Sequence, residues 1–227
     1  MAMAILYVVA TPIGNLEDIT LRALRILKEV DVIACEDTRH TLGLLTHFGI
    51  QKKLISCHAQ DEARGSKKIL DLLDEEQTVA YCSDAGTPGL SDPGILAVHL
   101  ARQAGHSVIP IPGASAFAAL VSAGGIFFKA ITFEGFLSVK PGKRRARLQE
   151  LMSRQEAFLV YESPFRIVKL LRDIADIDSE RMISVGRELT KLHEEIMTGT
   201  AQSAIETFER REIVKGEFAV LVSSAKK

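Results

Sequence analysis

Residues 83–94 carry the densest set of groups suited to binding a ligand. This stretch holds three glycines, two prolines and two aspartates, and the apolar residues 78–82 lead into it. Connections between a strand and a helix usually span about 2–6 residues, so a longer one is typical of a ligand site, with an ordinary turn-rich connection as the alternative. Glycine lets backbone groups approach a ligand closely. Asp92 followed by Pro93 predicts the N-cap and first residue of a helix.

Four further polar segments follow predicted strands. They are residues 11–15, 36–40, 161–164 and 187–195. Each one alone is weak evidence, because an Asp at a strand end is more often a helix cap and a Glu-rich run is usually a solvated face. Because ligands of open α/β sheets bind at the carboxyl ends of the strands, the five segments together predict a functional cleft.

Several common kinds of site are excluded by missing motifs. The sequence has no GxxxxGK[ST], no GxGxxG and no GxSxG. These absences argue against a P-loop nucleotide site, a Rossmann-type dinucleotide or methyltransferase site, and a hydrolase nucleophile elbow. The six histidines show no metal-ligand spacing, so no metal is expected. The residues alone therefore predict a small-molecule cleft without naming a reaction.

Composition predicts a globular protein in a reducing compartment. The 227 residues are 47% hydrophobic and 25% charged, with a net charge of −1. The apolar runs are too short to cross a bilayer, and residues 3–10 are typical of a first strand rather than a signal peptide. Cys35, Cys57 and Cys82 form no CxxC pair, which favours free thiols in the cytoplasm.

Residues 140–147 form a basic segment in an otherwise balanced chain. Five of these eight residues are Lys or Arg, namely Lys140, Lys143, Arg144, Arg145 and Arg147. A nucleic-acid binder with a balanced net charge must concentrate its basic residues in such a segment. A solvated surface segment is the alternative.

Strands and helices alternate along the chain with a spacing that predicts an α/β fold. In the first half, strands are expected at residues 5–10, 32–35, 54–57, 78–82 and 107–111, with helices between them. This βαβ spacing predicts a mostly parallel sheet. In the second half, strands are expected at residues 131–137, 157–161, 182–185, 193–198 and 218–222, in a mixed sheet. We expect two α/β domains, residues 1–114 and 115–227.

Six motifs resemble the ribosomal RNA small subunit methyltransferase I family of the tetrapyrrole methylase superfamily. They lie at residues 8–16, 34–39, 83–94, 133–137, 161–164 and 187–191. The resemblance implies S-adenosylmethionine-dependent 2′-O-methylation of a cytidine ribose in the decoding region of 16S rRNA. It also implies two α/β domains with a cofactor cleft between them, a cytoplasmic homodimer, and the small ribosomal subunit as partner.

The resemblance also assigns residues. The implied cofactor-binding residues are Pro12, Ile13, Asp84, Thr87, Ser115, Ala116, Tyr161, Arg187 and Glu217. The catalytic candidates are Asn15, Asp37, Arg39, Glu162, Glu188 and Lys191. A ribose hydroxyl needs a base or a cation that stabilises its alkoxide, so Asp37 or Glu188 is expected as the base. Lys191 and Arg39 are expected to hold phosphate or alkoxide. The basic segment is expected to contact rRNA phosphates, which gives affinity and salt dependence rather than sequence choice.

The sequence departs from the family pattern in three places. Phe165 stands where a histidine is expected, residues 58–62 match their motif loosely, and the chain lacks the helical C-terminal extension of many members. Two alternatives stay open. One is a methyltransferase acting on a corrin or porphyrin precursor, which shares the cofactor site but gives no reason for the basic segment. The other is a non-catalytic ribosome-binding relative.

Overall fold

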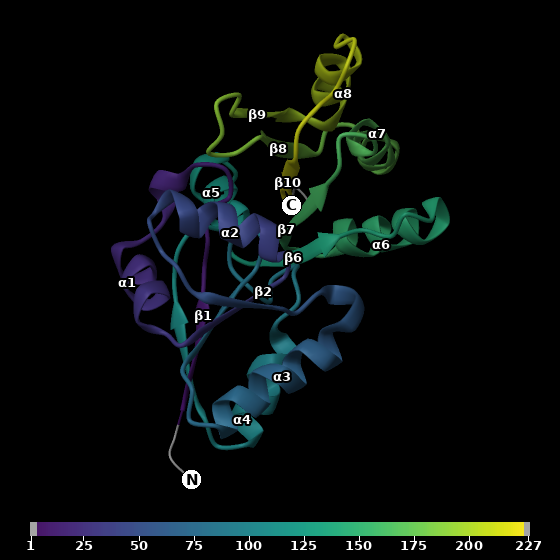
Figure 1. Cartoon of the computed structure of the whole chain (residues 1–227). Helices are drawn as coiled ribbons and strands as arrows, with labels where there is room; N and C mark the ends of the chain where they lie inside the picture. Colours follow the sequence, from purple (N-terminus) through teal and green to yellow (C-terminus); the bar gives the residue numbers. More distant parts are fainter. Residues whose placement is uncertain (1–3, 225–227) are drawn as a thin grey trace. The chain divides into compact units, whose positions relative to one another are not determined.

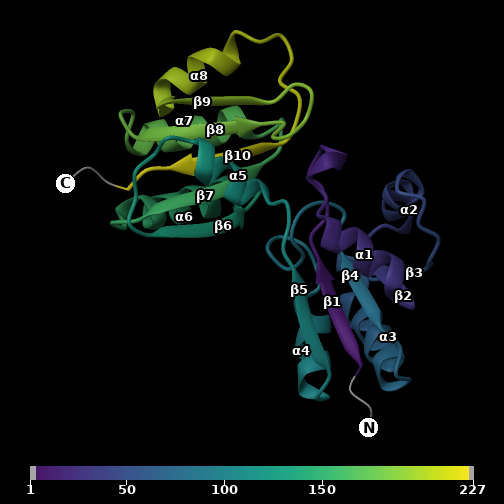
Figure 2. The same cartoon turned by 90° about the vertical axis from the view of Figure 1, so that its left-hand side faces the viewer.

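The computed structural model describes residues 4–224, which form two compact units (Figures 1 and 2). The first unit extends to Ser115 and the second begins at Ala116. Each unit is built on its own five-stranded sheet. An α/β architecture with one parallel and one mixed sheet confirms the predicted fold class.

The first sheet is parallel throughout, in the order β3-β2-β4-β1-β5. Its strands are β1 (Ile5–Val9), β2 (Val32–Cys35), β3 (Lys53–Ser56), β4 (Val79–Cys82) and β5 (Ser107–Ile111). Its α-helices are α1 (Leu21–Glu29), α2 (Thr38–His47), α3 (Glu62–Asp74) and α4 (Ile95–Gln103), with short 3-10 helices η1 (Leu16–Asp18) and η2 (Ala59–Asp61). A parallel sheet brings the carboxyl ends of all five strands to one edge.

Alternation along the strands divides the first core into two layers. Ile33 and Cys35 of β2 pack with α1 and α2, whereas Ala34 faces α3 and α4. Successive strand side chains point to opposite faces, so a strand covered on both faces is apolar throughout. That requirement explains why all four residues of β2 are buried.

The second sheet is mixed, in the order β6-β7-β10-β8-β9. Its strands are β6 (Ile131–Phe136), β7 (Ala157–Glu162), β8 (Met182–Arg187), β9 (Glu195–Thr200) and β10 (Phe218–Val222). Its helices are α5 (Ala116–Ala123), α6 (Pro141–Ser153), α7 (Ile167–Ile177) and α8 (Ala201–Glu209). Strands β6 and β7 are parallel, whereas β10 is antiparallel to both β7 and β8.

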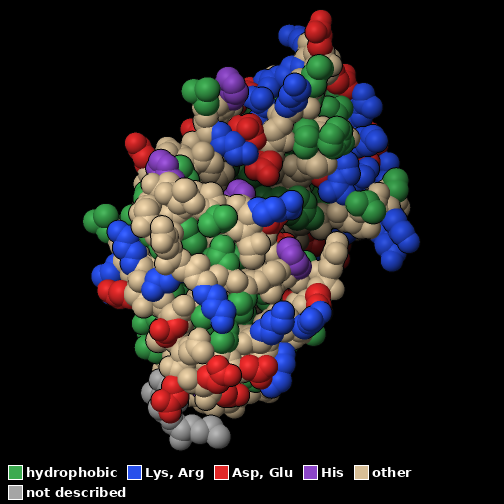
Figure 3. Space-filling model, in the orientation of Figure 1, with side chains coloured by type: hydrophobic (Ala, Val, Ile, Leu, Met, Phe, Trp, Pro, Cys, Tyr) green, Lys and Arg blue, Asp and Glu red, His purple; other side chains and the backbone are tan. Residues whose placement is uncertain are grey.

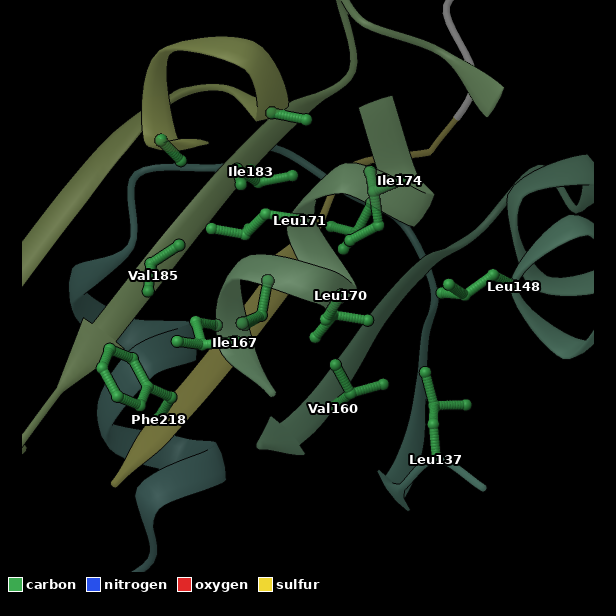
Figure 4. Close-up of a cluster of buried hydrophobic side chains, with 14 of the residues drawn as sticks. Leu137, Leu148, Val160, Ile167, Leu170, Leu171, Ile174, Ile183, Val185 and Phe218 are labelled. Atoms are coloured by element: carbon green, nitrogen blue, oxygen red, sulfur yellow. The ribbon is translucent and has the colours of Figure 1, made fainter. Parts of the chain in front are cut away.

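One apolar core joins the second sheet to three of its helices (Figure 4). Leu170 of α7 packs near Val160 of β7, and Ile174 of α7 belongs to the same core, with further side chains from α6 and α8. Helix α5 packs on β8 and β10, where a Cβ added to Gly186 would lie 3.1 Å from Leu120 Cδ1. Gly186 lies on the face opposite Val185, so α5 covers the other side of the sheet.

The predicted cap of α4 is wrong. The N-cap is Gly94 at φ +126°, two residues after Asp92, and Glu62 Oε1 accepts hydrogen bonds from the Gly94 and Leu96 N–H groups at 2.8 and 3.4 Å. Asp92 is half-buried and its carboxylate interacts with Ser83 instead. A carboxylate from another helix therefore takes the role that the sequence assigned to the local aspartate.

None of the helices in residues 4–224 is both long and apolar enough to span a membrane.

Candidate functional site

The loop after β4 is joined to the end of β1 by paired backbone hydrogen bonds. Thr11 N–H donates to Gly86 O at 2.9 Å, and Gly86 N–H donates to Thr11 O at 3.0 Å. The Thr11 hydroxyl also donates to Ser83 O at 3.3 Å. Gly86 has φ +82°, and a Cβ there would lie 3.2 Å from Ile13 Cγ2. Glycine is thus needed where two loops meet closely.

Two more loops join the same edge. Asp37 N–H, just after β2, donates to Asp84 Oδ1 at 2.9 Å. The Thr87 hydroxyl donates to Ala114 O, just after β5, at 3.2 Å. The loops after β1, β2, β4 and β5 therefore form one hydrogen-bonded group, which we call the first-sheet edge.

The predicted residues of the first unit all lie on this edge, in different environments. Pro12 is buried and Ile13 is half-buried directly after β1. Ser115 Oγ is buried and has no hydrogen-bond partner among residues 4–224. A buried hydroxyl without a partner is costly unless a ligand or water completes it, so Ser115 fits a binding role.

Asn15 and Asp37 both cap helices, which was the alternative for each. Asn15 Oδ1 accepts from Glu17 N–H at 3.1 Å, and Asp37 Oδ1 accepts from Arg39 N–H at 2.8 Å. The Arg39 guanidinium also pairs with Asp37 at 2.9 Å, and its side chain is otherwise exposed. Hydrogen bonds from the Arg39 side chain and backbone lower the pKa of Asp37 to about 2. A carboxylate held this acidic is a weak base.

Sequence reasoning missed Glu36 and gave Asp92 the wrong role. Burial, followed by repulsion from Asp84 and Asp92, raises the pKa of Glu36. Burial also raises the pKa of Asp92, against the hydrogen bond with Ser83. The first-sheet edge is therefore rich in carboxyl groups, and such an edge favours a cationic ligand group. The sequence feature that could have identified Glu36 is its position beside Asp37, directly after an apolar strand.

At the second sheet, an ammonium group lies between two carboxylates. Lys191 Nζ is 2.9 Å from Glu188 Oε1 and 2.8 Å from Glu217 Oε2. Burial would lower the pKa of Lys191, but its hydrogen bonds to both glutamates outweigh that effect and raise it. Burial would raise the pKa of Glu188. Hydrogen bonds from Lys191 and from the Glu217 backbone outweigh that effect, so the pKa of Glu188 is lowered. Both groups therefore stay charged near neutral pH.

The backbone around this cluster is strained. Glu188 and Thr190 have φ +50° and +67°, a region that L side chains rarely adopt. A Cβ added to Gly216 would meet Glu188 Cγ at 2.5 Å, which fixes glycine beside the cluster. Such backbone outliers concentrate at functional sites, because the surrounding structure must hold them.

Glu162 is the most deeply buried charged candidate. It is 2% exposed and ends β7, with Oε1 2.6 Å from Arg166 Nη2. Ser163 N–H also donates to Oε1, at 2.7 Å. Glu162 Oε2 and Arg166 Nη1 are buried without a hydrogen-bond partner among residues 4–224. Register places Glu162, Phe218 and Arg187 in one row across β7, β10 and β8.

Aromatic rings surround the predicted cofactor residue Tyr161. Its hydroxyl accepts from Phe117 N–H, in the first turn of α5, at 2.9 Å. The Tyr161 ring lies 5.1 Å from the Phe133 ring and 5.7 Å from the Phe136 ring, both edge to face. Ala116 is the first residue of α5. Tyr161 and Ala116 therefore share the α5 side of the second sheet.

Arg187 ends β8 and is held mainly by backbone oxygens. Its Nε donates to Lys215 O at 2.7 Å, and Nη1 donates to His193 O at 3.3 Å. Together with Glu162, Glu188, Lys191 and Glu217, it belongs to the ends of β7, β8 and the start of β10. We call this group the second-sheet edge.

The basic segment opens α6, and Lys and Arg side chains gather on this part of the surface (Figure 3). The arginines of the segment are paired with acidic side chains. Arg144 is only 6% exposed and lies 2.6 Å from Asp173 of α7. Arg145 pairs with Asp176 and Arg147 with Glu134. Lys140 and Lys143 are exposed and form no ion pair within residues 4–224. The prediction of phosphate contact therefore fits the lysines, whereas Arg144 holds α6 against α7.

Among residues 4–224, no cluster of three His, Cys, Asp or Glu side chains is suited to a metal ion.

Comparison with known proteins identifies the class of protein to which the chain belongs. Residues 5–205 match the model of the tetrapyrrole (corrin/porphyrin) methylases. The fold agrees with the crystal structure of the methyltransferase CobJ, with a TM-score of 0.73, 17% identity, and coverage of 99% of this chain and 95% of that one. Uroporphyrin-III C-methyltransferase from Thermus thermophilus, solved with S-adenosylhomocysteine, gives a TM-score of 0.65, 18% identity, and coverage of 95% and 96%. The protein is a methyltransferase of this class.

Closer relatives narrow the family. The chain is 48% identical to ribosomal RNA small subunit methyltransferase I of Borrelia garinii subsp. bavariensis, covering 96% of this chain and 98% of that one. It is 43% identical to the protein of that name from Thermotoga maritima, covering 97% and 99%. The relative from Halalkalibacterium halodurans is longer, with 75% of its length covered at 45% identity. The chain belongs to the ribosomal RNA small subunit methyltransferase I family.

Proposed function

We propose that this protein transfers a methyl group from S-adenosylmethionine to the ribose 2′-oxygen of a cytidine in the decoding region of 16S rRNA. The observation that carries the proposal is identity of 43–48% along nearly the whole chain with relatives named as small-subunit rRNA methyltransferases. The cytoplasm as location and a homodimer as the working form belong to the same proposal.

The first-sheet edge suits the donor chemically. S-adenosylmethionine supplies a methyl group on a cationic sulfonium. Asp84, beside the partly buried Glu36 and Asp92, places negative charge where a cation would be held. Thr87 and the partnerless Ser115 hydroxyl offer polar contacts to the same ligand. Pro12 and Ile13 provide an apolar wall directly after β1.

Residues of the second unit complete the proposed donor contacts. Tyr161 and Ala116 offer an aromatic and an apolar surface on the α5 side of the sheet. Arg187 and Glu217 offer charged groups at the second-sheet edge. Purine rings bind in apolar slots with a few polar edge contacts, which this combination supplies.

Lys191 is the proposed group for the ribose oxygen. Its ammonium is held by Glu188 and Glu217, and its raised pKa keeps it charged at neutral pH. A fixed cation stabilises the negative charge that develops on the attacking oxygen. Asp37 and Glu188 have lowered pKa values, so each is a weaker base than an ordinary carboxylate. The proposed chemistry therefore depends more on alignment and charge than on a strong base.

Lys140 and Lys143 are the proposed phosphate contacts. Both are exposed at the start of α6, whereas the neighbouring arginines are paired with acidic side chains. Contacts of this kind give affinity for RNA without sequence preference. Arg39, exposed beside Asp37, is a further candidate for phosphate.

A transfer assay with methyl-labelled donor tests the function. Purified protein is incubated in parallel with unmethylated 30S subunits, naked 16S rRNA and tetrapyrrole precursors, and label in RNA is then mapped by nuclease digestion and mass spectrometry. We expect label on one cytidine ribose of 16S rRNA. Label in a tetrapyrrole would support the alternative methyltransferase, and label in neither would support a non-catalytic relative.

A further inference from the structure

The Glu162–Arg166 pair contains one unused acceptor and one unused donor. Glu162 Oε1 and Arg166 Nη2 are joined at 2.6 Å, which leaves Glu162 Oε2 and Arg166 Nη1 without partners among residues 4–224. The Glu162 side chain is fully buried, and the Arg166 side chain is 21% exposed. Buried polar atoms normally have hydrogen-bond partners. The absence of a partner for both of these atoms therefore requires an explanation.

The turn that carries the pair is rigid. Arg166 N–H and Ile167 N–H both donate to Ser163 O, at 3.1 and 3.0 Å. Pro164 restricts the backbone of the same turn. Between these anchors, Phe165 is 86% exposed. A large apolar ring is thus held in solvent by the turn that joins Glu162 to Arg166.

We propose that Glu162 and Arg166 read the Watson–Crick edge of a cytosine, with Phe165 stacking on its ring. Cytosine offers its N4 amine as donor and N3 as acceptor, which match a carboxylate oxygen and a guanidinium N–H. Uracil offers O4 as acceptor and N3–H as donor, which reverses both contacts. Unpaired RNA bases are read by hydrogen bonds to their edges and by stacking on aromatic side chains.

Position favours the substrate base over the adenine of the methyl donor, whose edge has the same polarity. Glu162 follows Phe158 and Val160 along β7, so it faces the α6, α7 and α8 side of the sheet. Tyr161, the aromatic residue proposed for the donor's purine ring, faces the α5 side, whereas Arg187, proposed for a charged contact with the donor, shares the row of Glu162. Glu162 of β7 is also two strands away from Arg187 of β8, and neighbouring strands lie about 4.8 Å apart. Lys191 follows Arg187 in the loop after β8. A single nucleotide can thus contact Glu162 through its base and Lys191 through its ribose oxygen.

The inference rests on the proposed function, and its test keeps the two separable. Single-turnover methylation is measured on 30S subunits carrying either C or U at the mapped position, for the wild type and for Glu162→Gln. An amide can donate where the carboxylate only accepts, so the C-to-U preference should fall about tenfold or more. Glu209→Gln is the matched control, because it alters an exposed Glu–Arg pair with Arg172.

Phe165 provides variants that leave the buried pair intact. Phe165→Leu should weaken RNA binding about fivefold or more, whereas Phe165→His keeps a flat ring and should retain most of it. Phe127→Leu is the control, because Phe127 is 98% exposed before the start of β6. Melting temperature and donor affinity are measured for every variant.

The outcomes are distinct. If the wild type methylates no cytidine ribose, the proposed function fails. If it does so but Glu162→Gln keeps the C-to-U preference, or Phe165→Leu binds RNA as the wild type does, the base-reading role is wrong. Loss of donor affinity in Glu162→Gln, with an unchanged preference, would assign the pair to the donor's adenine instead. If Glu162→Gln does not fold, the Phe165 variants decide.

Discussion

Asp84 Oδ1 accepts a hydrogen bond from the Asp37 N–H at 2.9 Å, which ties the loop after β4 to the loop after β2. A carboxylate thus holds two strand ends together while standing among other acidic groups, Glu36 and Asp92. The arrangement keeps negative charge concentrated where the first sheet presents its strand ends. It gives Asp84 both a structural bond and a proposed ligand role, and these can be separated by mutation.

Asp84→Ala should affect ligand binding more than folding. Loss of one partly buried acceptor costs about 1 kcal/mol of unfolding free energy. Loss of the carboxylate should weaken S-adenosylmethionine binding by about 100-fold, or about 2.7 kcal/mol, because charged contacts are stronger than neutral ones. Calorimetric titration and urea unfolding measure the two effects. Equal losses in both would make the donor assignment wrong.

Lys191→Met should lower the methylation rate by about 100-fold, because the alkoxide loses its fixed cation. The donor affinity should change much less, since Lys191 is proposed for the ribose oxygen. Single-turnover rates at saturating donor and RNA provide the measurement. Lys169→Met is the control for a lost surface lysine, because Lys169 of α7 is exposed and has no proposed role. A rate within about threefold of the wild type would rule out Lys191 as the group that stabilises the alkoxide.

Asp37 should contribute stability that disappears in acid. Its pKa is lowered from the ordinary range to about 2, so the ionised form is favoured in the folded state. The contribution is present above the unfolded pKa of about 3.9 and is lost as the pH falls through the folded value. Asp37→Asn keeps the cap but removes the charge. The stability difference from the wild type, measured by urea unfolding, should therefore shrink from pH 5 to about pH 2.

The lysines and arginines of the basic segment should behave differently. The double variant Lys140→Ala, Lys143→Ala should reduce the slope of log affinity against log salt by about 1.4, at about 0.7 per phosphate contact on single-stranded RNA. Stability should change little. Arg144→Ala should instead cost about 3 kcal/mol, because it leaves Asp173 partly buried without its partner. An unchanged slope in the double variant would exclude the lysines from RNA binding.

Local patterns predicted the elements well, because strands such as β2 and β5 are apolar runs bounded by turn residues. The helix cap of α4 was missed because Glu62 approaches from another helix, which no local pattern records. The pairing of Arg144 with Asp173 was missed for the same reason, since 29 residues separate them. The exposure of Phe165 depends on the path of a turn, and only coordinates reveal it.

The reciprocal bonds between Thr11 and Gly86 also determine how the first-sheet edge responds to local opening. They connect β1 and the loop after β4, and β1 and β4 are neighbours inside the sheet, whereas β3 is an outer strand. Fraying of β3 leaves this connection in place, because outer strands open at lower free energy than inner ones. A ligand held at the Thr11–Gly86 connection would slow amide exchange in β1 and β4 and leave exchange in β3 nearly unchanged.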